Sequence, residues 1–187
     1  MTTRIFFVRH GQVDNPDKVM YGRLPGFALS SKGKKQIAKT AKLLSKKNVS
    51  AIYASPLLRT KQSAKIIADI LHLPINYSED ILEVKSSLQG QTFSYISDHF
   101  PKLNVYAFAK NNFSDETIED VEQRMQEFAD KIIKKYKGKN IVVVGHGDPI
   151  MIIKAQREGL PMEIDSIRPV KGYIQPGEIY MTEFNSR

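Results

Sequence analysis

The sequence predicts an α/β protein, a three-layer α/β/α sandwich with a mostly parallel central sheet. Short apolar runs rich in β-branched residues alternate along the chain with helical patterns, which is typical of parallel strands covered by helices. The runs lack polar alternation, which indicates strands that are buried on both faces. The predicted strands lie at residues 5–8, 51–54 and 141–144.

Helical periodicity fills the segments between these strands. Ser30 or Ser31 can cap the first helix, and Gly138 is a plausible stop for the third. Pro149 suits the first turn of the fourth helix, which ends at Gly159. The predicted helices cover about residues 31–47, 57–71, 114–137 and 149–158.

Two segments do not follow this alternation of strands and helices. Residues 173–184 alternate weakly around Pro176-Gly177, which predicts a strand at the sheet edge with a turn. Residues 84–113 have no clean periodicity and are rich in aromatic side chains. Such an insertion is often a lid over an active site, and a satellite core is the alternative. No linker interrupts the chain, so we expect residues 1–187 to form a single domain.

Composition narrows the possible functions. The 187 residues include no cysteine, which excludes a disulfide scaffold, a thiolate metal site and a cysteine nucleophile. The net charge of +8 favours an anionic partner, namely phosphate, nucleic acid or an anionic membrane. Neither a signal peptide nor a spanning apolar stretch is visible, so a cytoplasmic location is expected.

Charged and imidazole side chains follow the predicted strands. Arg9 and His10 follow the first, Arg59 stands just after the second, and His146 follows the third. Ligands of open α/β sheets bind beyond the carboxyl ends of the strands, where these side chains would converge. Guanidinium groups match phosphate oxygens, and an imidazole can be a ligand, a base or a nucleophile.

This set of residues favours phosphoryl transfer over metal binding. Arginines beside the histidines would oppose a divalent cation, and the four histidines lack the spacing of a zinc site. A phosphohistidine, with arginines that neutralise the phosphoryl oxygens, fits the residues better. We therefore expect neither a metal nor another cofactor.

Three motifs in a fixed order also resemble a known family. They are Arg9-His10-Gly11 with Asn15 and Gly22-Arg23 after it, Ser55-Pro56-Leu57-Leu58-Arg59-Thr60, and Val143-Val144-Gly145-His146-Gly147. Together they resemble the histidine phosphatase superfamily, which has the phosphoglycerate mutase-like fold. The resemblance spans residue 4 to about residue 159, and three motifs that each follow a predicted strand are far more specific than one.

The resemblance implies a role for each residue. His10 would be the nucleophile, while Arg9, Arg59 and His146 would bind the transferring phosphoryl group. Glu83 falls where the family places its acid/base residue, and would protonate the leaving alkoxide before it helps to activate water. Glu79 and Asp80 are competitors for this role, since the glycines that usually follow the family's glutamate are reduced here to Gly90.

Two further residues have two interpretations each. Smaller members of the family use residues at the positions of Asn15 and Arg23 near the pocket mouth. In a loop rich in glycine and proline, Asn15 can equally be a turn residue and Arg23 a surface cation.

The expected function is that of a metal-independent phosphatase that hydrolyses a small phosphomonoester through a phosphohistidine. Phosphoglycerate mutase-type transfer is the alternative, and a non-catalytic phosphate- or nucleic-acid-binding module is a third. The lysine-rich helix faces are typical of solvated surfaces, so no specific nucleic-acid partner and no membrane partner is expected. The sequence predicts neither the identity of the substrate nor the oligomeric state.

Overall fold

A five-stranded sheet forms the centre of the computed structural model, which describes residues 1–100, 104, 106 and 114–185. The strands are β1 (Thr2–Arg9), β2 (Val49–Ala54), β3 (Ile75–Tyr77), β4 (Asn140–Gly145) and β5 (Ile179–Asn185). Their order is β3-β2-β4-β1-β5. All neighbours are parallel except β5, which pairs antiparallel with β1 at the edge. The predicted mostly parallel sheet is confirmed, and the C-terminal segment is an edge strand.

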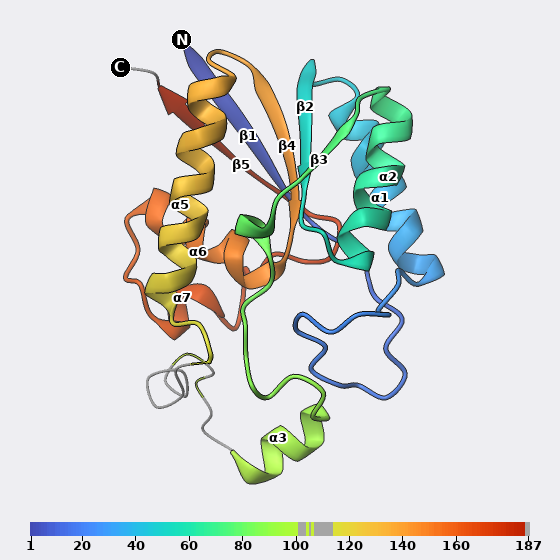
Figure 1. The fold of residues 1–187 in the computed structure, drawn as a ribbon, viewed down its shortest axis with the longest axis vertical. Helices are drawn as coiled ribbons and strands as arrows, with labels where there is room; N and C mark the ends of the chain where they lie inside the picture. The colour runs from blue at the N-terminus through green and yellow to red at the C-terminus, as the bar shows by residue number, and fades with distance from the viewer. Residues whose placement is uncertain (101–103, 105, 107–113, 186–187) are drawn as a thin grey trace.

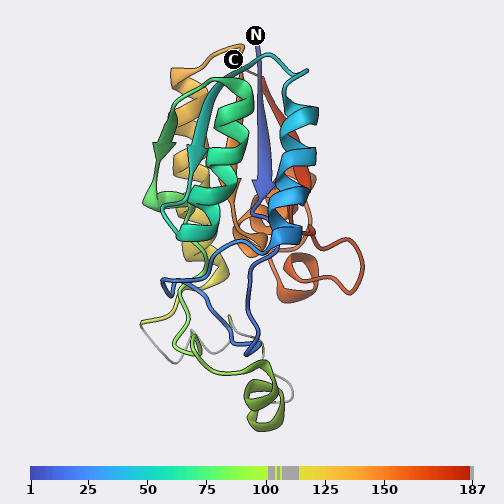
Figure 2. The same cartoon turned by 90° about the vertical axis from the view of Figure 1, so that its right-hand side faces the viewer.

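Helices cover both faces of the sheet, as the three-layer prediction requires. Figures 1 and 2 show α1 and α2 on one side, with α5 and α6 on the other. The main helices are α1 (Ser31–Leu44), α2 (Leu58–Leu71), α5 (Ile118–Lys135) and α6 (Gly147–Glu158). Shorter helices in the described part of the chain are the 3-10 turn η1 (Glu79–Ile81), α3 (Phe93–His99) and α7 (Ile164–Ile167).

The apolar side chains of the strands belong to two hydrophobic cores, one on each face of the sheet. In β1, Ile5 and Phe7 pack into the layer of α5 and α6. Phe6 and Val8 point the other way, into the layer of α1 and α2. Both sets are buried because successive side chains of a strand face opposite sides of the sheet. This explains why the predicted strands lack polar alternation.

Helix ends differ from the predicted bounds where capping decides them. Ser30 caps α1 by accepting a hydrogen bond from the Gly33 amide at 3.0 Å, in agreement with one of the two predicted caps. The start predicted at Ser114 is wrong, because α5 begins at Ile118. Thr117 and Asp120 form a reciprocal capping box there, which satisfies amides at the helix start that would otherwise lack partners.

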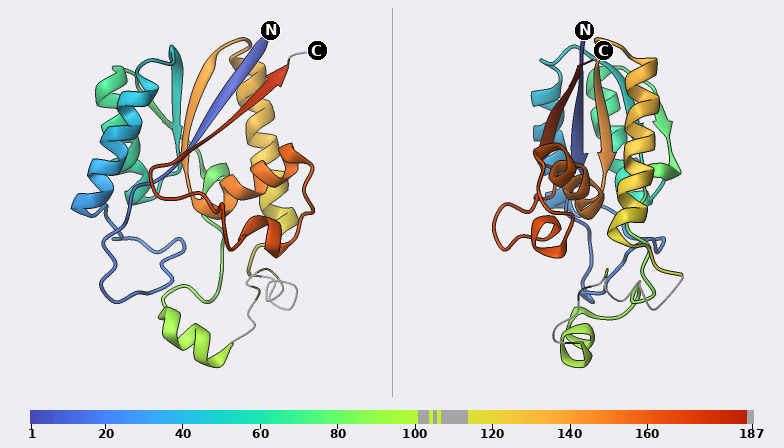
Figure 3. Two further views of the ribbon diagram at one scale, coloured as in Figure 1. Left: turned by 180° about the vertical axis from the view of Figure 1, so that it is seen from behind. Right: turned by 90° about the vertical axis from the view of Figure 1, so that its left-hand side faces the viewer.

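Two irregular segments lie beyond the carboxyl ends of the parallel strands. They are the loop that follows β1 and the chain that carries α3, and both are visible at the lower end of the molecule in Figures 1 and 3. Backbone hydrogen bonds join them: Met20 accepts from Gly90 at 2.8 Å and donates to Gln91 at 2.8 Å. Part of the predicted lid, residues 101–103, 105 and 107–113, lies outside the described residues.

No helix in the described ranges has the length and apolar character needed to cross a membrane.

Candidate active site

The carboxyl edge of the sheet brings two histidines and an arginine together. Arg9 pairs with Gly145 at the ends of β1 and β4, so the next residues, His10 and His146, are neighbours. Their ring centroids are 5.4 Å apart. Arg59, in the first turn of α2, donates from Nε to His10 Nε2 at 3.3 Å and from Nη2 to His146 Nδ1 at 3.2 Å. All three side chains are buried.

His10 has the protonation pattern of a nucleophile. Its Nδ1 lies 2.8 Å from the Gly11 carbonyl oxygen, so Nδ1–H donates and Nε2 keeps its lone pair. Burial, and then the positive charge of Arg59, lowers the pKa of His10 well below its ordinary value. Gly11 is needed for this turn, since a Cβ at that position would lie 2.4 Å from the Gly33 carbonyl oxygen.

Arg59 is a buried cation whose hydrogen-bond acceptors are all neutral. Besides the two imidazoles, it donates to the Gly22 carbonyl oxygen at 2.7 Å, and its guanidinium lies 4.7 Å from the centre of the Tyr21 ring. Within the described residues, no carboxylate hydrogen-bonds to it. Burial lowers the pKa of Arg59, and the nearby charge of Glu83 opposes this shift without a hydrogen bond between the two side chains. This arrangement favours an anionic ligand.

Arg9 adds a second guanidinium that has spare donor capacity. Its Nη1 donates to the Ile174 carbonyl oxygen at 2.7 Å, and its guanidinium lies 5.2 Å from the centre of the Tyr173 ring. Its Nε is buried and has no hydrogen-bond partner in the described part of the chain. Buried donors are nearly always paired in folded proteins, so this free N–H is a second sign of an anion site.

His146 precedes α6 and is held by a serine of the second motif. Its Nε2 lies 2.8 Å from Ser55 Oγ, and since Arg59 donates to Nδ1, the proton of the neutral ring is on Nε2. Burial and then Arg59 lower the pKa of His146 well below its ordinary value. Ser55 belongs to a motif that the sequence analysis recognised, but its contact with His146 was not predicted.

Glu83 is the carboxylate that the fold places beside the histidines. Its Oε2 is 3.9 Å from His146 Nδ1, and its side chain is 18% exposed. Burial, and then the negative charge of Asp148, raises the pKa of Glu83 above its usual value. The competitors differ, since Glu79 is exposed and the Asp80 carboxylate accepts from Ser78 Oγ and pairs with a lysine.

A polar clasp holds the backbone around Glu83. Arg23 Nε donates to the Glu83 carbonyl oxygen at 2.6 Å, and Glu116 accepts from the Lys85 amide at 2.9 Å. Glu116 also pairs with Arg23 at 2.7 Å and with Arg124 at 3.0 Å. Burial alone would raise the pKa of Glu116, but Arg124 and these hydrogen bonds hold it below its ordinary value.

The two residues predicted near the pocket mouth act within the loops in this structure. The Asn15 side chain donates to the Val19 carbonyl oxygen at 2.9 Å and accepts from the Val19 amide at 3.1 Å, so it closes its own turn. Arg23 belongs to the clasp around Glu83. Among the described residues, neither side chain hydrogen-bonds to His10.

Asp148 is a buried carboxylate that the sequence analysis missed. It lies in the first turn of α6 and accepts from Tyr106 Oη at 2.8 Å, from Tyr173 Oη at 2.6 Å and from Arg168 Nε at 2.8 Å. A Cβ on Gly147 would lie 2.1 Å from Tyr173 Oη, so the glycine permits this approach. The available signal was a lone carboxylate directly after the third motif.

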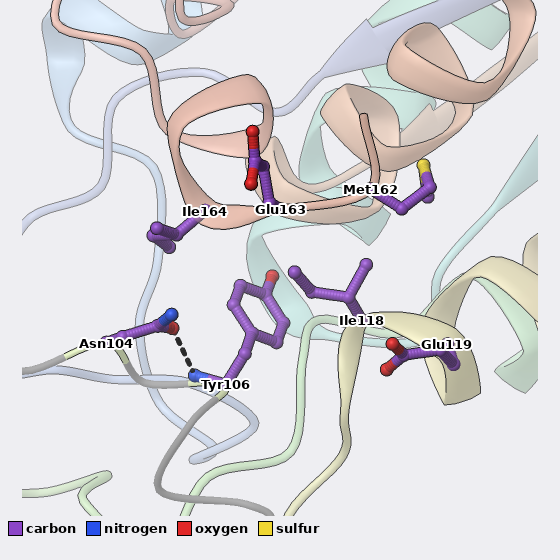
Figure 4. A pocket seen from close by; sticks show the side chains of 7 residues that line it. All are labelled: Asn104, Tyr106, Ile118, Glu119, Met162, Glu163 and Ile164. Atoms are coloured by element: carbon purple, nitrogen blue, oxygen red, sulfur yellow. Dashed lines mark hydrogen bonds between the residues drawn. The ribbon is translucent and has the colours of Figure 1, made fainter. Parts of the chain in front are cut away.

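Two of the cavities near these groups differ in chemistry. One of about 130 Å³ adjoins Glu83 and Arg168. The other, of about 250 Å³, is drawn in Figure 4 and lies beside Tyr106. The carboxylates of Glu119 and Glu163 line the second cavity, and the described residues add no cation to it. The larger cavity is therefore unsuited to a phosphate group.

The described residues hold no group of three His, Asp or Glu side chains suited to a metal ion. The positive charges nearest to His10 are those of Arg59 and Arg9.

Fold and site together define an α/β protein with a cluster of histidines and arginines at the carboxyl edge of its sheet. The family model of the histidine phosphatase superfamily (branch 1) matches residues 5–180, and the chain belongs to this family. The predicted family is thereby confirmed.

Relatives and solved structures agree with this assignment. The chain is 31% identical over 160 residues to the uncharacterized protein Rv0525 of Mycobacterium tuberculosis (84% of this chain, 79% of the relative). It is 28% identical over 170 residues to the uncharacterized phosphatase PhoE of Bacillus subtilis (90% and 84%). The structure of YhfR from Bacillus stearothermophilus superposes with a TM-score of 0.82 at 23% identity (96% and 90%), a likeness of fold.

Proposed function

We propose that the protein is a metal-independent phosphatase that hydrolyses a small phosphomonoester through a phosphohistidine at His10. The observation that carries the proposal is the buried Arg59, a cation that bridges two neutral imidazoles and has no hydrogen bond to a carboxylate among the described residues. Family membership supports it, as does the similarity to a relative that is named a phosphatase.

The first half-reaction transfers the phosphoryl group to the protein. The lone pair of His10 Nε2 attacks phosphorus, an N–P bond forms, and the P–O bond to the leaving alcohol breaks. Arg59 and the free Nε of Arg9 stabilise the charge on the phosphoryl oxygens. Glu83 donates its proton to the leaving oxygen. Because its pKa is raised, Glu83 stays protonated to higher pH than an ordinary glutamate does.

The second half-reaction restores the protein. The Glu83 carboxylate now accepts a proton from water as the water oxygen attacks phosphorus, and the N–P bond breaks to release inorganic phosphate. The positive charges that favoured the first transfer also favour the second, because both transition states place negative charge on the same oxygens.

His146 changes its role when an anion binds. In the structure its pKa is lowered by burial and by Arg59, so the ring is neutral. A phosphate dianion beside it supplies the opposite charge and favours the protonated ring. Nδ1 would then donate to a phosphoryl oxygen, with Ser55 still holding Nε2.

The test is to trap the phosphohistidine. Purified protein is mixed with 4-nitrophenyl phosphate in the presence of EDTA, quenched in alkali because phosphohistidine is labile in acid, and mapped by mass spectrometry. We expect phosphate on the peptide that holds His10, and no turnover by His10→Ala. His99→Ala is the matched control, since this imidazole is exposed and stacks on Tyr95. Turnover retained by His10→Ala would contradict the proposal.

The same preparation separates the alternatives. Interconversion of 2- and 3-phosphoglycerate that is faster than phosphate release would indicate mutase-type transfer. Phosphate binding without any phosphoenzyme would indicate a non-catalytic module.

A further inference from the structure

The cavity of about 130 Å³ beside Glu83 has a mostly apolar wall. Its apolar side chains are Met20, Tyr21, Val84 and Phe93. They come from the two irregular segments beyond the sheet, which are joined by the hydrogen bonds of Met20 to Gly90 and Gln91. The wall is thus formed where the two segments meet.

This cavity adjoins the phosphate cations. The ring of Tyr21, part of the wall, lies 4.7 Å from the Arg59 guanidinium, and Gly22, also in the wall, accepts a hydrogen bond from Arg59. Glu83 lines the cavity and reaches to 3.9 Å from His146. A phosphoryl group on Arg59 and His10 would therefore place the ester oxygen near Glu83 and the alcohol in the cavity.

The volume of the cavity suits a body about the size of one ring. A protein cavity of roughly 150 Å³ lined by apolar side chains accepts benzene. The cavity beside Glu83, at about 130 Å³, is close to that size.

The charged groups of the wall are already engaged. Arg168 donates to the Asp148 carboxylate through both Nε and Nη2. Glu83 must carry a proton to act as the acid, and burial raises its pKa in that direction. Two further polar side chains belong to the described wall. Ser86 is buried and accepts from the Leu88 amide at 3.3 Å, and the Tyr21 hydroxyl interacts with Arg9.

Few partners therefore remain for a polar leaving group. Each sugar hydroxyl that lost its water without a new hydrogen bond would weaken binding, and a buried ammonium or carboxylate would weaken it more. An apolar ring or alkyl group has no hydrogen bonds to water to lose, and its burial against Met20 and Phe93 strengthens binding.

We infer that the protein prefers phosphomonoesters of compact apolar alcohols, with the alcohol held by Met20, Tyr21, Val84 and Phe93, over sugar phosphates and phosphoserine. This inference rests on the proposed phosphatase function.

The experiment compares kcat/KM for benzyl phosphate, glucose 6-phosphate and O-phosphoserine. All three esters release a primary alcohol, so differences report on binding of the alcohol more than on bond strength. We expect benzyl phosphate to exceed the other two by about tenfold or more, as the contacts of an apolar group in a matching pocket provide.

A pair of variants assigns the preference to the cavity. Phe93→Ala removes an exposed ring of the wall, so folding should be retained, and we expect the ratio of benzyl phosphate to glucose 6-phosphate to fall about tenfold. Tyr95→Ala, on the same helix and outside the wall, should leave this ratio unchanged.

The outcomes separate this inference from the function beneath it. If a phosphohistidine forms but glucose 6-phosphate or phosphoserine is the better substrate, the inference is wrong and the phosphatase stands. The same holds if Phe93→Ala and Tyr95→Ala give equal ratios. If no ester is hydrolysed and no phosphohistidine forms, the proposed function fails and the inference with it.

Discussion

The two ends of the site are built by different means. At the phosphate end, His10, Arg59 and His146 stand on strand ends or in the first turn of a helix, and backbone carbonyls and neighbouring imidazoles hold them. At the leaving-group end, Glu83 lies in irregular chain that side-chain ion pairs with Glu116 hold in place. The sheet thus fixes the part that every phosphomonoester shares, while loops form the part that differs between substrates.

The two ends also keep their protons in opposite ways. Burial and Arg59 lower the pKa of His10, which favours the unprotonated form of the proposed nucleophile. Burial and Asp148 raise the pKa of Glu83, so the proposed acid keeps its proton to higher pH than an ordinary glutamate does. One low-polarity environment therefore prepares a base and an acid, because burial favours the neutral form of each.

We expect the largest loss of activity from a substitution at the phosphate end of the site. Arg59→Met removes a buried charge that contacts both histidines, and we expect kcat/KM to fall about 10²–10³-fold for every phosphomonoester. The expected loss is the same for aryl and alkyl esters, because all of them present the same phosphoryl group. Steady-state kinetics on 4-nitrophenyl and benzyl phosphate measure it.

Arg157→Met is the control for this change, since Arg157 is an exposed arginine on α6. If the loss of kcat/KM in Arg59→Met depended strongly on the leaving group, the proposed division of roles between the two ends of the site would be wrong.

A change at the acid should depend on the leaving group. Glu83→Gln cannot donate a proton, so we expect kcat/KM for benzyl phosphate to fall about 10²-fold, within the usual range for general acid catalysis. The loss for 4-nitrophenyl phosphate should be much smaller, because nitrophenolate leaves without protonation. Parallel kinetics on the two esters test this.

The pH profile gives a second measurement for the same carboxyl group. The protonated form is active in the first half-reaction, so wild-type kcat/KM for benzyl phosphate falls as pH rises through the pKa of Glu83. Because that pKa is raised, the fall occurs at higher pH than for an ordinary glutamate. In Glu83→Gln this fall should vanish, and a profile unchanged from the wild type would assign the acid to another group.

The smallest effect is expected at the clasp. Glu116→Gln weakens the pairs with Arg23 and Arg124, and we expect a loss of about tenfold or less in kcat for benzyl phosphate, with KM nearly unchanged. Glu116 acts through Glu83, so 4-nitrophenyl phosphate should be hardly affected.

Glu119→Gln, an exposed neighbour on α5, serves as the control for Glu116. Equal losses on both esters would mean that Glu116 stabilises the fold without a role in positioning the acid.

Much of the fold and the phosphate end was predictable from the sequence. Arg9, His10 and His146 directly follow apolar strands and Arg59 begins the helix after one, so their convergence follows from the geometry of parallel sheets. Glu83 was suggested by the family resemblance alone. The three-residue strand β3 gave too little pattern to predict, and the start of α5 was predicted too early.

The contacts that define the leaving-group end were not predictable. Glu116 pairs with Arg23, and Asp148 with Arg168, across stretches of chain that carry no periodic signal. The sequence left two interpretations open for both Asn15 and Arg23. In the structure, Asn15 hydrogen-bonds to Val19, and Arg23 hydrogen-bonds to Glu83 and Glu116.

Local sequence pattern was enough to predict most of the sheet, the helices that cover it, and the histidines and arginines at its carboxyl edge. Each of these follows from local pattern, because apolar runs form buried strands and the residues after them must emerge at one edge. The apolar cavity, the clasp around Glu83 and the hydrogen bonds around Asp148 became visible in the folded chain alone. Those depend on loops whose shape is set by contacts with distant parts of the chain, and such contacts leave no periodic trace in a single sequence.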